Sequence, residues 1–97
     1  MNILSIDTSS NKEVCVWLRS VNFEDILKQK ITVQKAQVVL PLIDQLLKKH
    51  NLQLSDVTGI GVNVGPGSFT GLRVGISIAN ALGFALKIPI NNRLVLK

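Results

Sequence analysis

Residues 70–87 constrain the fold of this chain most strongly, because they predict a helix with apolar side chains on nearly all sides. Gly71, Gly75, Ala79 and Gly83 recur at every fourth position and give this helix one smooth stripe. Leucine, isoleucine, valine and phenylalanine cover most of the remaining surface. Because such a helix has to be buried nearly all round, we expect the sheet to cover one side and a partner protein to cover another.

Length and composition limit what the rest of the chain can provide. The 97 residues make about one domain, so residues 1–97 are expected to form a single lobe. A hydrophobic content of 46% and a charged content of 18% exclude a disordered chain. A domain of this size buries roughly 60–65% of its unfolded surface, so its core is thin. A large uncovered apolar face would be hard to tolerate.

Charge, cysteine content and the lengths of the apolar stretches indicate the cellular compartment in which we expect the protein. The formal net charge is +5, and the cations are scattered, which favours simple solubility over a weak preference for an anionic partner. Cys15 is the only cysteine, which fits a reducing environment. The first ten residues lack the basic leader of a signal peptide, and the longest apolar stretch, 72–86, is shorter than a bilayer-spanning helix. We expect a cytoplasmic protein with no membrane partner.

The order of elements predicts an α/β fold with the sequence β-β-β-α-β-α-β. Strands are expected at 2–7, 13–19, 25–33 and 58–64, with a last strand from 88 to 95 or 96, and helices at 34–50 and 70–87. Short links suggest that the first three strands are antiparallel and that the third lies near an edge. The β-α-β-α-β part implies parallel strands. Pro41 should either kink the first helix or mark its true start.

Two loops carry the residues that could bind a nucleotide. Backbone N–H groups in the glycine-rich loop that opens the second helix could cradle a phosphate, although the loop lacks the Walker A lysine. The turn after the first strand offers a carboxylate and three hydroxyls to a Mg²⁺–nucleotide. The simpler interpretation is a tight strand-to-helix turn, a capping hydroxyl and an Asp-initiated turn. The nucleotide candidates are Asp7, Gly65, Gly67, Ser68 and Thr70.

Both helices carry more apolar surface than a small sheet covers, which favours an exposed patch for a partner. The alternative is that the helices pack only on each other and on the sheet. The candidate partner-binding residues are Val39, Ile43, Leu46, Leu72, Gly75, Ile76, Ala79, Leu82 and Gly83. We expect Gly75→Leu to abolish partner binding while the chain stays folded. We assign no catalytic residue and no cofactor. We also assign no metal ligand, because His50 is the only histidine.

The segment Gly65-Pro-Gly-Ser-Phe-Thr-Gly-Leu-Arg-Val-Gly75 resembles the TsaB (YeaZ) family. The opening Ile3-Leu-Ser-Ile-Asp-Thr-Ser9 is similar to that family's first strand and turn, and Leu40-Pro-Leu-Ile-Asp44 to its first helix. The resemblance implies an actin/Hsp70-like (RNase H-like) fold with a mixed five-stranded sheet per lobe. This chain would correspond to the N-terminal lobe, whereas family members usually have a second one.

The resemblance also implies a role. TsaB is the non-catalytic partner of TsaD in the bacterial synthesis of threonylcarbamoyladenosine in tRNA, and TsaE joins the complex. The two helices would then pair with the equivalent helices of TsaD, or with a second copy in a homodimer, and tRNA would be an indirect partner. A small nucleotide-binding protein and a self-associating homodimer of the same fold remain as alternatives.

Overall fold

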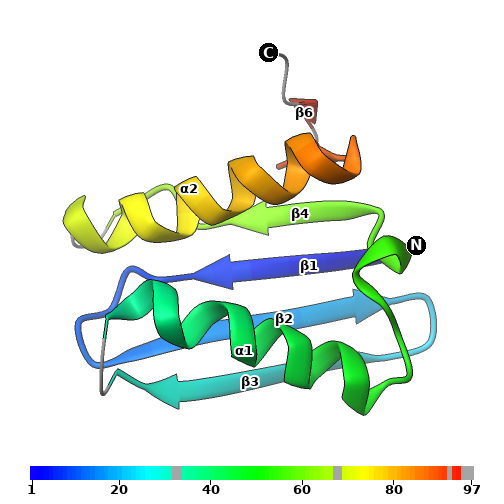
Figure 1. Ribbon diagram of the computed structural model, residues 1–97, viewed down its shortest axis with the longest axis horizontal. Helices are drawn as coiled ribbons and strands as arrows, with labels where there is room; N and C mark the ends of the chain where they lie inside the picture. Colours follow the sequence, from blue (N-terminus) through cyan, green and yellow to red (C-terminus); the bar gives the residue numbers. More distant parts are fainter. Residues whose placement is uncertain (32–33, 67–68, 92, 95–97) are drawn as a thin grey trace.

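The computed structural model describes residues 1–31, 34–66, 69–91 and 93–94 (Figure 1). Its elements are β1 (Asn2–Asp7), β2 (Glu13–Ser20), β3 (Glu24–Lys30), α1 (Lys35–Lys49), the 3₁₀ turn η1 (Leu54–Asp56), β4 (Gly59–Val62), α2 (Phe69–Leu86), β5 (Pro89–Ile90) and β6 (Arg93–Leu94). The predicted order of strands and helices is confirmed, with β6 as an addition. Residues 32–33 and 95–96, which the sequence places in strands, lie outside the described residues.

The strands form one mixed sheet in the order β3-β2-β1-β4-β5-β6. β1 pairs antiparallel with β2, β2 pairs antiparallel with β3, and β1 pairs parallel with β4, as the link lengths predict. β4 and β5 are also parallel. The polar strand β3 lies at one edge. The N-terminal strand is therefore central, and its partners come from both halves of the chain.

The last predicted strand is interrupted. Instead of one run from residue 88, the chain turns at Asn91, whose φ of 48° lies in the left-handed region that asparagine tolerates better than most residues. The side chain of Asn91 holds this turn, because it accepts a hydrogen bond from Val62 N at 3.0 Å and donates one to Val62 O at 3.1 Å. β5 and β6 consequently pair antiparallel as a short hairpin at the sheet edge.

Pro41 lies inside α1 and does not mark its start, since the helix begins at Lys35. Proline removes the hydrogen bond to the carbonyl of Gln37, one turn earlier. Both residues are exposed, so water can take the place of the missing donor. The cost of proline is smallest on this solvent side of the helix.

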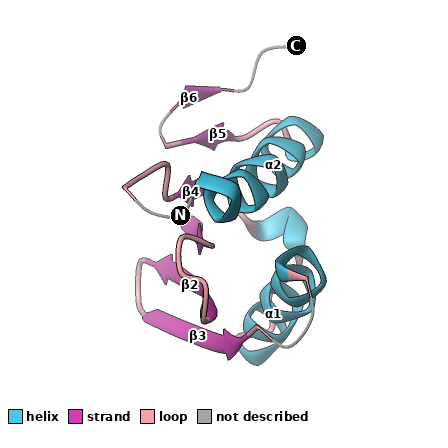
Figure 2. Ribbon diagram, turned by 90° about the vertical axis from the view of Figure 1, so that its left-hand side faces the viewer, coloured by secondary structure: helices cyan, strands magenta, loops and turns pink. Residues whose placement is uncertain are grey.

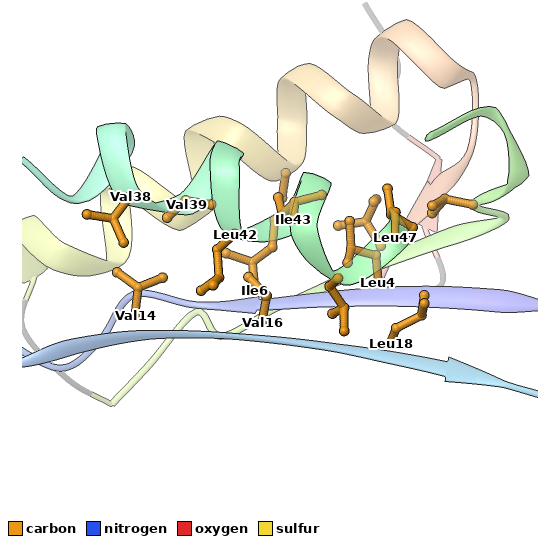
Figure 3. Packing of buried hydrophobic residues seen from close by; sticks show 14 of the residues in the cluster. Leu4, Ile6, Val14, Val16, Leu18, Val38, Val39, Leu42, Ile43 and Leu47 are labelled. Atoms are coloured by element: carbon orange, nitrogen blue, oxygen red, sulfur yellow. The ribbon is translucent and has the colours of Figure 1, made fainter. Parts of the chain in front are cut away.

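Both helices pack on the same face of the sheet (Figure 2). Strand residues that alternate with half-buried ones supply the lower layer of the core, and the inner stripe of α1 supplies the upper layer (Figure 3). The fully buried members are Leu4, Ile6, Val14, Val16, Leu18, Val39, Leu46 and Ala79. Among the described residues no helix covers the opposite face, and none of the described helices is long and apolar enough to cross a membrane.

Candidate functional site

The small-residue stripe of α2 faces the interior. Gly75 N–H donates to the hydroxyl of Thr8 at 2.9 Å, and that hydroxyl in turn donates to the carbonyl of Gly71. A Cβ atom added to Gly75 would lie 2.7 Å from Thr8 Oγ1 and 3.5 Å from Val62 Cγ2. The stripe therefore lets α2 approach β1 and β4 closely. The sequence analysis instead assigns Gly75, Ala79 and Gly83 of this stripe to a contact with a partner protein.

The predicted partner-binding residues consequently divide into two groups. Most pack inside the chain, and the expectation that Gly75→Leu leaves the chain folded conflicts with the contact of Gly75 with Thr8. The buried members are Val39, Ile43, Leu46, Leu72, Gly75, Ala79 and Gly83. Ile76 and Leu82 are half-buried and reach the surface. That these residues contact a partner stays a prediction. Most of the exposed apolar side chains that such a contact needs have to come from other positions.

An apolar groove of about 360 Å³ runs between α1, α2 and η1. Leu40, which is 53% exposed, forms one wall, and Leu54 and Leu82 form others. The remaining lining residues are Ile43, Asp44, Leu47, Lys48, Leu52 and Gln53. The groove lies toward the C-terminal ends of α1 and α2, where the two helices diverge and η1 lies between them, so a single partner surface can contact both (Figure 1).

The outer side of α2 adds a second apolar anchor. Phe84 is 52% exposed and follows the exposed residues Arg73, Ser77 and Asn80 at helical spacing. We define the two-helix face as the groove together with Leu40 and Phe84. Sequence reasoning missed both anchors because it sought the densest apolar arc, and that arc is buried. Leu40 was detectable as an apolar residue outside the i, i+3, i+4 pattern of α1.

Asp7, at the end of β1, is held by its neighbours. Its Oδ1 atom accepts hydrogen bonds from Ser9 N at 2.9 Å and from Asn63 Nδ2 at 3.2 Å. Burial raises the pKa of Asp7, but these hydrogen bonds and the charge of Lys35 outweigh it, so the pKa lies below the ordinary value. Asn63 also accepts from Gly65 N–H at 3.0 Å. The network joins the β1 turn to the glycine-rich loop.

This network limits what the nucleotide candidates can do. The structure brings Asp7 close to Gly65 through Asn63, and Thr70 is exposed in the first turn of α2. Gly67 and Ser68 lie outside the described residues. Of the three hydroxyls after β1, that of Thr8 is buried and bonded to α2. Within the described part of the chain, no group of three or more His, Cys, Asp or Glu residues is placed to hold a metal ion.

A cluster that the sequence did not predict ties β3 to the end of α1. Asp25 Oδ2 lies 2.9 Å from Lys49 Nζ and 2.8 Å from His50 Nε2, and the His50 ring stacks on Phe23 at 4.1 Å between centroids. The hydrogen bond from Lys49, and then that from His50, lower the pKa of Asp25 to about 2. The cluster is structural, since it joins two elements at the molecular surface.

The sheet order and the two helices on one face define an actin/Hsp70-like (RNase H-like) α/β lobe. YeaZ from Pseudomonas aeruginosa superposes with a TM-score of 0.84 at 34% sequence identity, over 92% of this chain and 41% of that one. The family model of TsaD, tRNA N6-adenosine threonylcarbamoyltransferase, matches residues 26–92.

Curated relatives agree with the structural match. The TsaB proteins, named for tRNA threonylcarbamoyladenosine biosynthesis, are 36% identical in Buchnera aphidicola of Schizaphis graminum and 34% identical in Escherichia coli. These alignments cover 91% and 93% of this chain, and 41% and 38% of the relatives. The chain therefore belongs to the TsaB (YeaZ) family, within the wider group that the TsaD model describes. It spans about two fifths of the length of these relatives.

Proposed function

We propose that this chain is a non-catalytic binding subunit that docks its two-helix face on a TsaD-type protein. In that complex it supports threonylcarbamoyl transfer to adenosine in tRNA, and TsaE joins the larger assembly. The relatives that match nine tenths of this chain are named for this biosynthesis, which supports the proposed pathway.

The groove between α1, α2 and η1 is the observation that carries the proposal. It is an apolar depression rimmed by charged and polar side chains, which is the composition of a protein-binding site. Asp44 and Lys48 form an ion pair of 3.0 Å at the rim. Leu40, in the wall of the groove, and Phe84, on the outer side of α2, are apolar anchors that a partner would bury.

The kind of partner follows from the family match. Because the TsaD model matches residues 26–92, a TsaD-type protein is expected to have its own helices equivalent to α1 and α2. Two such helix pairs can pack face to face, with the anchors of each entering the groove of the other. The same argument allows a second copy of this chain to occupy the face when TsaD is absent.

Complex formation with the TsaD protein of the same organism tests the proposal. We expect one eluting species with the mass of a one-to-one complex by light scattering. Leu40→Lys places a charge in the groove and should abolish this species. Ile26→Lys is the matched control, because Ile26 is 48% exposed but lies on β3 and does not line the groove. Two separate peaks for the wild-type chain would overturn the proposal.

Two further measurements separate the alternatives. Light scattering of the isolated chain at several concentrations distinguishes a monomer from a homodimer, and a dimer that Leu40→Lys dissociates would use the same face. Calorimetry with millimolar Mg²⁺–nucleotide tests the nucleotide-binding alternative at Asp7 and the glycine-rich loop. Complementing these, addition of the chain to TsaD and TsaE should raise threonylcarbamoyl transfer to tRNA, and Leu40→Lys should remove that increase.

A further inference from the structure

β3 forms an open edge of the sheet, and among the described strands β2 is its one neighbour (Figure 1). Ser20 N–H donates to Phe23 O at 2.8 Å, and Ile31 N–H donates to Lys12 O at 3.0 Å. Bonded and non-bonded pairs alternate along an antiparallel ladder, so the odd-numbered residues of β3 bond to β2. The even-numbered residues turn their backbone N–H and C=O groups outward, away from the sheet.

One of these outward groups is already occupied. Ile26 N–H donates to Oδ1 of the preceding Asp25 at 2.8 Å. Among the described residues of β3, Ile26 alone has a side-chain acceptor for its backbone N–H. A backbone donor that is bonded to a neighbouring side chain is not available to another strand.

The carboxylate of Asp25 is held in this position from α1. Its second oxygen, Oδ2, lies 2.9 Å from Lys49 Nζ and 2.8 Å from His50 Nε2. The His50 ring stacks in turn on Phe23, the residue before β3. A freely rotating surface aspartate would leave its neighbour's N–H open for part of the time. Because this carboxylate is bound at both oxygens, it stays at the strand edge.

The sequence of β3 is complementary to itself. Two β3 strands paired antiparallel about Leu27 would place Glu24 of each copy opposite Lys30 of the other. These positions are even-numbered, so their outward backbone groups would form the bonded pairs of the new ladder. Opposite charges at directly opposing positions favour this register. The register also needs the Ile26 N–H groups near its centre, and these are the groups that Asp25 occupies.

We propose that Asp25 guards the outer edge of β3 against addition of the same strand from a second copy of this chain. The carboxylate bonds the N–H group that the added strand would need, and the cationic end of α1 keeps it there. Edge strands need such protection because their unpaired backbone groups template pairing with other chains. The inference is independent of the TsaD contact, because β3 does not line the groove of the two-helix face.

Amide hydrogen exchange of the full 97-residue chain, followed by NMR, tests the guard directly. Ile26 and Lys28 both turn their N–H groups outward at the same edge, but only Ile26 has the Asp25 acceptor. After correction for intrinsic rates, we expect Ile26 N–H to exchange at least about tenfold more slowly than Lys28 N–H. The difference should disappear in Asp25→Ala. Equal exchange of the two groups in the unmodified chain would overturn the proposal.

Removal of the guard should open the edge to a second copy. By light scattering over a dilution series, Asp25→Ala should self-associate at a concentration at least about tenfold lower than the unmodified chain does. Adding Lys28→Pro should abolish this association, because proline removes an outward donor and leaves the ladder to β2 intact. Adding Leu40→Lys should leave it unchanged, since Leu40 lies in the groove on the helical side.

Asp25→Asn separates the guard from the stability of the cluster. Asparagine loses the charge that Lys49 and His50 bind, but it keeps an oxygen that can accept from Ile26 N–H. We therefore expect it to self-associate less than Asp25→Ala. Circular dichroism melts establish that both variants are folded, and if Asp25→Ala is not, the exchange rates of the unmodified chain decide.

Three results of the association experiment would count against the guard. The first is a folded Asp25→Ala variant that stays monomeric at every concentration. The second is equal self-association of the alanine and asparagine variants, which would assign the effect to lost stability. The third is an association that Leu40→Lys abolishes and Lys28→Pro does not, which would place the second copy on the two-helix face.

Discussion

Thr8 joins the end of β1 to the first turns of α2 through one buried hydroxyl. That hydroxyl donates to Gly71 O and accepts from Gly75 N–H, and the side chain is 1% exposed. Both bonds are possible only because α2 presents small residues here. Strand and helix are thereby fixed relative to each other at the position where the two candidate nucleotide loops meet.

Thr8→Val tests this role. Valine keeps the shape of threonine but leaves Gly75 N–H without its buried acceptor, so the free energy of unfolding should fall by about 1–3 kcal/mol. Urea denaturation of the variant measures the change. Thr8→Ser is the control, because it retains the hydroxyl and loses one methyl group, at about 1 kcal/mol. A valine variant as stable as the wild-type chain would contradict the assignment.

Gly75→Leu should now unfold or strongly destabilise the chain instead of affecting only partner binding. The new side chain would meet Thr8 and Val62, and overpacking of a core costs about 1–3 kcal/mol or more. Thermal unfolding followed by circular dichroism measures the effect. Ser77→Leu adds the same side chain to an exposed position of α2 and should leave the melting temperature nearly unchanged.

At this scale, the sequence predicted which residues are apolar or small but not which way they face. The spacing of Gly71, Gly75, Ala79 and Gly83 correctly predicted a close approach, yet a stripe of small residues does not specify what approaches it. The partner of the stripe is Thr8, more than sixty residues away in the sequence. Asp7 was detectable as a turn residue, while its bond to Asn63 depends on the pairing of β1 with β4.

Between elements, the cluster of Asp25, Lys49 and His50 attaches the edge strand β3 to the C-terminal end of α1. Such a contact matters because, within the part of the chain that the structure describes, β3 pairs with β2 alone. Lys49 and His50 lie at the C-terminal end of α1, where cations interact favourably with the helix dipole. The structure gives Lys49 and His50 a carboxylate as well.

The cluster predicts how stability responds to acid. The pKa of Asp25 is about 2 in the folded chain, below the ordinary 3.8, so its contribution is present above pH about 4 and is lost as the pH falls toward 2. Urea denaturation between pH 2 and 6 should show that Asp25→Asn differs most from the wild-type chain above pH 4. The difference should disappear near pH 2.

Asp44→Asn serves as the control for this profile. Asp44 pairs with Lys48 on the exposed side of α1, and such surface pairs contribute little to stability. Its replacement should leave the pH profile close to that of the wild-type chain. If Asp25→Asn followed the wild-type profile as closely as Asp44→Asn does, the cluster would not stabilise the attachment of β3.

Element order, strand direction and both helices were predictable, because apolar periodicity and turn residues are local signals. The hairpin of β5 and β6 was not, since it depends on the bonds of Asn91 with Val62 on a neighbouring strand. Pro41 was ambiguous for a related reason. Whether a helix tolerates proline depends on which side faces water, and the sequence alone does not fix that side.

As a whole, the molecule has two unlike surfaces: the two-helix face on one side and, among the described residues, a sheet face that no helix covers on the other. We therefore expect binding of a TsaD-type partner to the helices to leave Trp17 as accessible to a soluble paramagnetic reagent as it is in the free chain. The ¹⁹F signal of fluorotryptophan incorporated at position 17 measures this accessibility. A fluorinated leucine at Leu82, which lines the groove, would respond instead. Strong protection of Trp17 by that partner would place it on the sheet.

The central position of β1 also affects how the chain is built during synthesis. β1 can pair with β2 as soon as a few more residues are synthesised. Its other edge stays unpaired until β4 is synthesised, more than fifty residues later, as the hydrogen bond between Asn2 N and Thr58 Oγ1 illustrates. A nascent chain can thus assemble the first three strands and α1 while one side of β1 stays unpaired. Until β4 emerges, that open edge can template wrong pairings, so we expect the ribosome and chaperones to shield the half-finished sheet.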